Sequence, residues 1–89
     1  MPPADEPFAT VTLIGKPGCH LCDDARAVVT AVLDGRAGVQ FDERSILDDA
    51  ELHDRYWDEI PVVLIDGDVH TIYRVDAERL RSALAERGH

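Results

Sequence analysis

One junction constrains the fold most strongly: a strand-like segment passes through a glycine-rich turn into an amphipathic helix. Residues 9–14 are rich in β-branched side chains, and the Gly-Lys-Pro-Gly sequence at 15–18 ends that pattern. After the turn, apolar side chains recur at the three-and-four spacing of one helix face. They are Leu21, Cys22, Ala25, Val28, Val29, Val32 and Leu33. This spacing predicts a strand at 9–14 and a helix that starts near residue 21 and ends before Gly35.

Three further segments of the chain have the pattern of strands. Val39 and Phe41 alternate with polar residues in 39–44, and residues 60–65 are almost entirely aliphatic. The Asp66-Gly67 pair that follows is a hairpin signal, because both residues tolerate a positive φ. We therefore predict strands at 39–44 and 60–65, and a returning strand at 69–73.

Two more helices are predicted from their capping residues. Asp48 and Glu51 have capping-box spacing, with Leu47 and Leu52 as the matching hydrophobic staple, and this predicts a helix of about two turns running towards Trp57. Asp76 is expected to cap the last helix in the same way. In that helix Val75 and Leu80 form the staple, Leu80, Ala83 and Leu84 form the apolar face, and Gly88 ends the helix.

The order of the predicted elements is strand, helix, strand, helix, strand, strand, helix. This order predicts an α/β fold with a four-stranded mixed sheet flanked by helices. The 89 residues make one domain. Residues 1–7 contain two acidic residues and three prolines, with no apolar segment of a secretory signal behind them. We expect residues 1–8 to be disordered, residues 9–89 to form the domain, and the protein to be a cytoplasmic monomer.

The charge balance narrows the range of partners. Eighteen acidic side chains oppose nine basic ones, which gives a formal net charge of −9. Binding to nucleic acid or to an anionic membrane depends on Lys and Arg, so we expect neither as a partner. The excess of acid serves solubility in the simplest interpretation, and selection of a basic partner protein is the alternative.

The two cysteines stand where the first strand passes into the first helix. Cys19 falls at or next to the helix N-cap, where unpaired N–H groups and the helix dipole favour a thiolate. Cys22 is in register with Ala25 and Val29 on the apolar stripe, so it should be shielded. An exposed, activated thiol next to a shielded one is the arrangement that disulfide exchange requires. We predict Cys19 as the nucleophile and Cys22 as the resolving thiol.

Neighbouring residues leave other interpretations open. His20 supports the Cys19 thiolate if it is protonated, or is an ordinary surface histidine, whereas Asp23 and Asp24 oppose ionisation of Cys19. A structural zinc site normally has a second close pair of ligands, and the remaining histidines lack such spacing, so we expect no metal site. Burial of both cysteines as inert core residues is the third possibility.

The same residues carry a family resemblance. Residues 15–25 read Gly-Lys-Pro-Gly-Cys-His-Leu-Cys-Asp-Asp-Ala, and residues 59–67 read Glu-Ile-Pro-Val-Val-Leu-Ile-Asp-Gly. Together they resemble the glutaredoxin-like branch of the thioredoxin superfamily, especially its small bacterial members. The resemblance implies a thioredoxin/glutaredoxin-like fold and thiol–disulfide oxidoreductase activity. It also implies a cis peptide bond between Ile60 and Pro61 that faces the cysteines, with the backbone of Ile60 binding the substrate.

Two other positions are compared with glutaredoxins. Lys16 stands where many of them carry a cation that contacts a carboxylate of glutathione, although an exposed turn lysine is the simpler interpretation. Asp76 matches their acidic turn, but the paired glycines before it are replaced by Tyr73 and Arg74. Arg74 either attracts an anionic substrate or is a solvated charge at the end of a strand.

The functional prediction is a dithiol oxidoreductase that reduces protein or small-molecule disulfides. It needs no bound cofactor, and glutathione or another thiol reductant would regenerate the dithiol as a co-substrate. One alternative is a metal or iron–sulfur module that uses Cys19 together with external thiols. Another is a redox-silent interaction domain that uses Tyr56 and Trp57, a pair that in the simpler interpretation packs its helix onto the sheet.

Overall fold

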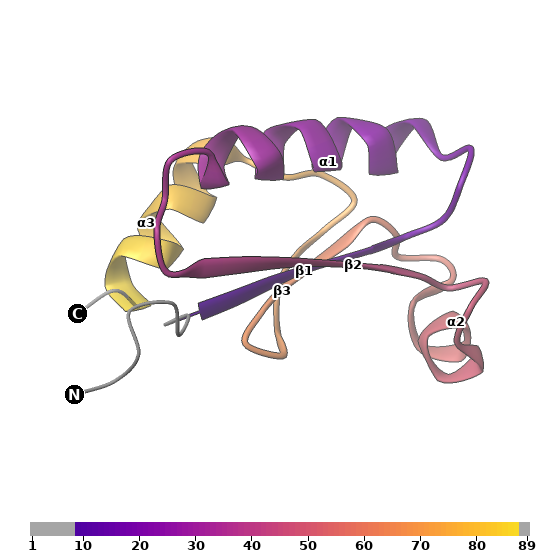
Figure 1. Ribbon diagram of the computed structural model, residues 1–89. Coiled ribbons are helices and arrows are strands. Elements are labelled where there is room, and N and C mark those ends of the chain that lie inside the picture. The colour runs from indigo at the N-terminus through magenta and orange to yellow at the C-terminus, as the bar shows by residue number, and fades with distance from the viewer. Residues whose placement is uncertain (1–8, 88–89) are drawn as a thin grey trace.

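The computed structural model describes residues 9–87 and shows a sheet with two helices on one face and one on the other (Figure 1). The elements are β1 (Ala9–Gly15), α1 (His20–Leu33), β2 (Val39–Ser45), α2 (Ala50–Tyr56), β3 (Val62–Ile65), β4 (Asp68–Ile72) and α3 (Ala77–Arg87). Their order confirms the predicted β-α-β-α-β-β-α fold. The disorder expected for residues 1–8 and the helix end expected at Gly88 lie outside the described residues.

The sheet is mixed, as predicted, with strand order β2-β1-β3-β4. β1 and β2 are parallel and are joined through α1, while β3 runs antiparallel to both β1 and β4. Ile14 near the end of β1 pairs with Val62 at the start of β3. The chain therefore leaves β1 towards Cys19 at the same end of the sheet at which it enters β3 from Pro61.

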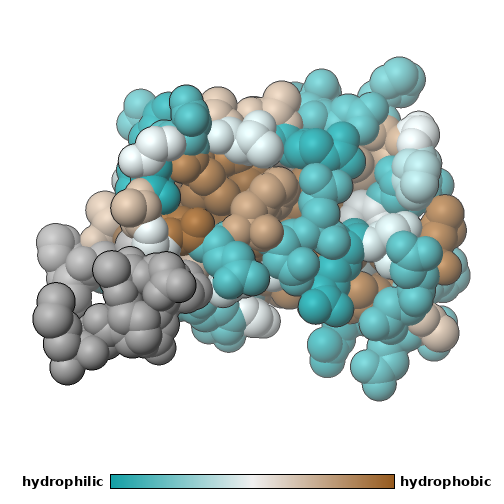
Figure 2. Space-filling model, viewed as in Figure 1, coloured by the Kyte–Doolittle hydropathy of each residue, from teal (hydrophilic) through white to brown (hydrophobic). Residues whose placement is uncertain are grey.

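Alternation along the strands divides the core between the two faces of the sheet. The face under α1 and α3 holds the larger cluster of buried side chains, which are Ala9, Val11, Leu13, Ala25, Val29, Val32, Val63, Ile65, Leu80 and Leu84. The face under α2 holds a smaller one, which is Ile14, Ile46, Tyr56 and Val62. In the view of Figure 1, hydrophobic side chains gather between α1 and the sheet, and hydrophilic ones cover most of the rest (Figure 2).

Local signals at the hairpin and at α3 are confirmed. Asp66 and Gly67 have φ values of 52° and 88°, the two positive angles of a type I′ turn. Oδ1 of Asp76 accepts hydrogen bonds from the backbone N–H groups of Glu78 at 2.8 Å and Arg79 at 3.2 Å, so Asp76 caps α3. Val75 packs against the cluster that contains Leu80, as the staple requires.

The predicted start of α2 is wrong by one residue. Asp49, not Asp48, is the N-cap, because its Oδ1 accepts the N–H groups of Glu51 at 2.9 Å and Leu52 at 3.2 Å. Leu47 is 65% exposed and therefore staples nothing. The physical reason is the turn before the helix: the Leu47 N–H donates to Oγ of Ser45, and the Asp48 N–H donates to the Ser45 carbonyl.

The bounds of the strands also differ from the prediction by one or two residues. The third strand begins at Val62 rather than at residue 60, because Ile60 and Pro61 form the loop that leads into it. The fourth strand begins at Asp68 and ends at Ile72, one residue earlier at each end than predicted. Within residues 9–87, no helix is long and apolar enough to cross a membrane.

Candidate functional site

Cys19 is the N-cap residue of α1, as predicted. Its backbone is extended, with φ −97° and ψ 113°, and its Sγ accepts the Cys22 N–H at 3.2 Å. The sulfur is partly exposed and lies at the positive end of the α1 dipole. This is the environment in which proteins use a cysteine thiolate as a nucleophile.

Cys22 lies one turn further along α1 in a contrasting environment. The residue is 1% exposed and belongs to the core. The pKa of the Cys22 thiol is raised to about 11, chiefly by burial and to a smaller extent by its hydrogen bond with Cys19. A hydrogen bond with the Lys16 backbone lowers this pKa but does not cancel the rise. Both cysteines are free thiols in this structure. Cys22 is therefore a protonated, shielded thiol next to the accessible sulfur of Cys19.

Gly15 makes room for the buried thiol, and sequence reasoning missed this. A Cβ atom at position 15 would lie 2.8 Å from Sγ of Cys22 and 3.1 Å from its Cβ. Real Cβ atoms do not approach this closely, so a side chain here would displace the sulfur. The sequence marks Gly15 only as a strand breaker, and nothing in the local pattern indicates its contact with Cys22.

The third part of the site is the loop before β3. The Ile60–Pro61 peptide bond is cis, as the resemblance implied. Pro61 is fully buried and Ile60 half-buried. The Pro61 carbonyl accepts the Tyr73 N–H at 2.8 Å, and the Tyr73 hydroxyl donates to the Asp58 carbonyl at 3.0 Å. Because Val62 pairs with Ile14, this loop lies at the end of the sheet from which the chain leaves β1 towards Cys19.

Comparison with known proteins agrees with this geometry. The family described as Glutaredoxin-like domain (DUF836) matches residues 10–85. The chain belongs to this family. The predicted resemblance is thereby confirmed, and the fold and the cysteine pair of this glutaredoxin-like domain together indicate a redox function. No curated protein matches the chain.

Solved structures show the same fold. The X-ray structure of target protein XcR50 from X. campestris is 33% identical, covers 85% of this chain and 96% of its own, and has a TM-score of 0.67. Protein Ne2328 from Nitrosomonas europaea is 21% identical, with coverage of 93% and 98% and a TM-score of 0.71. A mutant thioredoxin from Halobacterium salinarum is 14% identical, covers 97% of this chain and 79% of its own, and also has a TM-score of 0.71.

Three other predicted site residues of the glutaredoxin-like domain, Lys16, His20 and Asp76, lie on different segments. Lys16 is exposed and lines a cavity of about 310 Å³ that also reaches Cys22 and Glu43. His20 is the exposed first residue of α1. Asp76 uses one carboxylate oxygen to cap α3. The structure thus shows a structural role for Asp76, while the binding roles of all three stay predictions.

The charges beside the cysteines are partly paired. The guanidinium of Arg26 bonds to Asp23 at 3.0 Å and to Glu43 at 2.7 Å. The negative charge of Asp23, which was expected to oppose ionisation, therefore has a cation next to it. Within residues 9–87, no cluster of three or more His, Cys, Asp or Glu side chains is placed to hold a metal ion.

Two apolar residues near the site are more exposed than predicted. Leu21 was assigned to the buried stripe of α1 but is 41% exposed, because α3 does not extend over the first turn. Tyr56 is buried under the sheet, as packing predicted, whereas Trp57 at the C-cap of α2 is 59% exposed. The two aromatic residues thus have different roles, and only Tyr56 packs its helix onto the sheet.

Proposed function

We propose that this glutaredoxin-like domain is a thiol–disulfide oxidoreductase that reduces disulfides with Cys19 and Cys22. The observation that carries the proposal is the difference between the two sulfurs. Sγ of Cys19 is accessible and accepts an N–H group at the helix N-terminus, whereas Cys22 is buried and its pKa is raised to about 11. One thiol is therefore set to attack first, and its partner stays protonated until a mixed disulfide has formed.

The reaction proceeds through two thiol–disulfide exchanges. The Cys19 thiolate attacks one sulfur of the substrate disulfide; that bond breaks, and the other sulfur leaves as a thiolate that takes up a proton. Cys22 then loses its proton and attacks Sγ of Cys19, which forms the Cys19–Cys22 disulfide and releases the second substrate thiol. Two electrons pass from the protein to the substrate. No bound cofactor is involved in either step.

The proposed substrates are protein or small-molecule disulfides. Lys16, His20, Ile60, Pro61 and Asp76 are the proposed substrate-binding residues, and the cis Ile60–Pro61 loop at the cysteine end of the sheet supports a role for the backbone of Ile60. Glutathione or another thiol reductant would regenerate the dithiol. We place the reaction in the cytoplasm, where such reductants keep thiols reduced, and assign it to a monomer.

The test is to incubate the protein with a peptide disulfide, block free thiols by alkylation and count the adducts by mass spectrometry. Wild type is expected to end as an internal disulfide. Cys22→Ser should stop at a mixed disulfide on Cys19, because no resolving thiol remains, and Cys19→Ser should form neither product. Alkylation of the untreated dithiol should label Cys19 before Cys22, because Cys22 is buried and its pKa is raised to about 11. Rapid labelling of Cys22 before Cys19 would overturn the proposal.

A further inference from the structure

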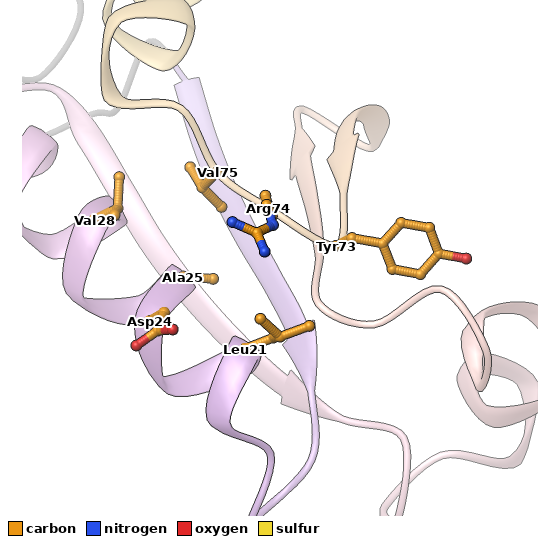
Figure 3. A pocket seen from close by; sticks show the side chains of 7 residues that line it. All are labelled: Leu21, Asp24, Ala25, Val28, Tyr73, Arg74 and Val75. Atoms are coloured by element: carbon orange, nitrogen blue, oxygen red, sulfur yellow. The ribbon is translucent and has the colours of Figure 1, made fainter.

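A groove lies on the α1 side of the site, and its lining includes none of the substrate-binding residues proposed above. It is lined by Leu21, Asp24, Ala25 and Val28 from α1 and by Tyr73, Arg74 and Val75 from the segment that joins β4 to α3, and its volume is about 150 Å³ (Figure 3). We call these seven residues the Arg74 groove. Leu21 lies in the first turn of α1, of which Cys19 is the N-cap, so the groove begins at the turn of the helix that follows Cys19.

An unusual turn fixes the position of Arg74. Tyr73 has a φ of 67°, a left-handed conformation that bulky residues rarely adopt. Across it, the Arg74 N–H donates to the Ile72 carbonyl at 2.8 Å, and the Thr71 hydroxyl donates to the Arg74 carbonyl at 2.9 Å. The Tyr73 ring points away from α1, while the Arg74 side chain points towards it (Figure 3). Such strain persists where the surroundings hold it, and it concentrates at functional sites.

The charge of Arg74 has no partner among residues 9–87. In this part of the chain Arg26, Arg44 and Arg87 each bond to a carboxylate, and the other Lys and Arg side chains, Arg74 among them, are in no ion pair. Among these unpaired cations, Arg74 is the one that lines this groove. Asp24 lines the same groove, yet it is not within ion-pair distance of Arg74. In a chain with a net charge of −9, an unpaired cation that is aimed into a groove lined mainly by aliphatic side chains is set to receive an anion.

The other residues that line the groove indicate which chemical group the ligand carries next to its anionic group. Ala25, Val28 and Val75 present apolar surface, and the volume of about 150 Å³ suits one aliphatic side chain. Cys19 does not line the groove, so an occupant that brings a sulfur to Cys19 must extend beyond it. An extended peptide does so, because each residue adds about 3.3 Å of reach.

We propose that the Arg74 groove binds the peptide segment next to the reactive cysteine of a protein substrate, with an aliphatic side chain against Ala25, Val28 and Val75 and a carboxylate on Arg74. This inference rests on the proposed disulfide reductase function and names its substrate class: protein disulfides flanked by an aliphatic and an acidic residue. Arg74 is the specificity-determining residue.

The test uses short peptides whose single cysteine forms a mixed disulfide with thionitrobenzoate, a leaving group that absorbs visible light. Three peptides carry Leu next to the cysteine and differ only in the following residue, which is Glu, Gln or Lys. Wild type should show about fivefold higher kcat/KM for the Glu peptide than for the Gln peptide, mainly through KM, as expected for one partly exposed ion pair. Arg74→Gln should remove this preference, and Arg74→Glu should shift it to the Lys peptide.

Arg81→Gln is the matched control, because Arg81 is exposed on α3 outside the groove and its loss changes the net charge equally. It should keep the Glu preference. The inference is overturned if wild type reduces all three peptides equally, if Arg74→Gln keeps the preference, or if Arg81→Gln also loses it. It is also overturned if Arg74→Gln raises only the KM for glutathione disulfide. Failure of the proposed function itself looks different, since wild type would then release no thionitrobenzoate from any peptide.

Discussion

The face of the sheet under α1 and α3 and the face under α2 support different parts of the site. The first holds the larger cluster of buried side chains, and Cys22 lies on the helix that covers it. The second holds a cluster of only four buried residues, and Ile60 packs against it from the loop before β3. The cysteine pair is therefore anchored in the main core, and the Ile60–Pro61 loop in a minor one.

This difference indicates how the two halves of the site are held. The position of α1 follows from close packing of apolar side chains. This interaction is non-directional, and the stability it provides grows with the buried area. The loop before β3 depends more on hydrogen bonds, since the Tyr73 N–H and hydroxyl bond to the carbonyls of Pro61 and Asp58. We therefore expect stability to depend chiefly on the first face and the geometry of the loop on the second.

The largest expected effect compares leucines on the two faces. Leu80 is fully buried under the first face, and Leu80→Ala should lower the free energy of unfolding by about 3 kcal/mol. Leu52 is half-buried on the second face, and Leu52→Ala should lower it by about 1 kcal/mol, because less apolar surface is lost. Urea unfolding measures both. Equal losses would refute the unequal division of the core.

Gly15 tests how tightly the first face holds Cys22. Gly15→Ala places a methyl group 2.8 Å from Sγ of Cys22, and overpacking of this kind should lower the free energy of unfolding by about 2 kcal/mol. The matched control is the same substitution in a Cys22→Ala background, where the sulfur is gone and most of the loss should disappear. Additive effects in this double-mutant cycle would show that Gly15 serves another purpose.

Tyr73→Phe tests the hydrogen bonds that hold the loop. It removes the hydroxyl that donates to the Asp58 carbonyl and should lower the free energy of unfolding by about 1 kcal/mol or less. Amide hydrogen exchange at residues 58–60 should become faster, while exchange in α1 stays unchanged. Asp58→Asn is the control, because the acceptor is a backbone carbonyl and should be unaffected. Equal acceleration in α1 would mean that the two halves of the site are not held separately.

The smallest expected effect is a pH dependence at β4. Burial lowers the pKa of His70, and the charge of Arg79 lowers it further; Nε2 of His70 has no hydrogen-bond partner within residues 9–87. A lowered pKa in the folded state means that the unfolded chain takes up the proton first. The contribution of neutral His70 to stability is therefore complete above the unfolded pKa of about 6.5 and is lost as the pH falls.

His70→Phe should flatten this acid slope in thermal unfolding measured between about pH 7 and pH 5. Replacing Arg79 with Gln should move the His70 titration, followed by NMR of the ring protons, back towards the ordinary value. An unchanged slope in His70→Phe would assign the acid sensitivity to other groups.

Local sequence signals predicted the elements whose ends are fixed by their own residues. The Asp66-Gly67 turn needs two positive φ angles, and Asp76 caps α3 through its own carboxylate, so neither depends on distant contacts. The register of Cys22 with Ala25 and Val29 likewise predicted its burial. The asymmetry of the cysteine pair could therefore be predicted from this spacing together with the position of Cys19 at the start of the helix.

Features set by neighbouring elements could not be predicted in this way. Asp48 and Asp49 are equally suitable caps, and the hydrogen bonds of the preceding turn to Ser45 decide between them. Leu21 continues the apolar spacing but lies beyond the reach of α3, so it borders a groove instead of the core. The direction of Arg74 depends on a backbone conformation of Tyr73 that its side chain does not favour.

The atom with which Cys19 caps α1, its Sγ, is also the nucleophile of the proposed reaction. In the dithiol, Sγ of Cys19 accepts the Cys22 N–H at 3.2 Å. A sulfur that is bonded to another sulfur is a weaker hydrogen-bond acceptor than the sulfur of a free cysteine, so oxidation removes part of the cap from the first turn of α1. The midpoint potential of a dithiol reflects the difference in stability between its two folded forms, and capping present only in the reduced form makes the pair more oxidising. Substitutions in that turn should therefore change the midpoint potential through their effect on helix stability, even where the new side chain contacts neither sulfur.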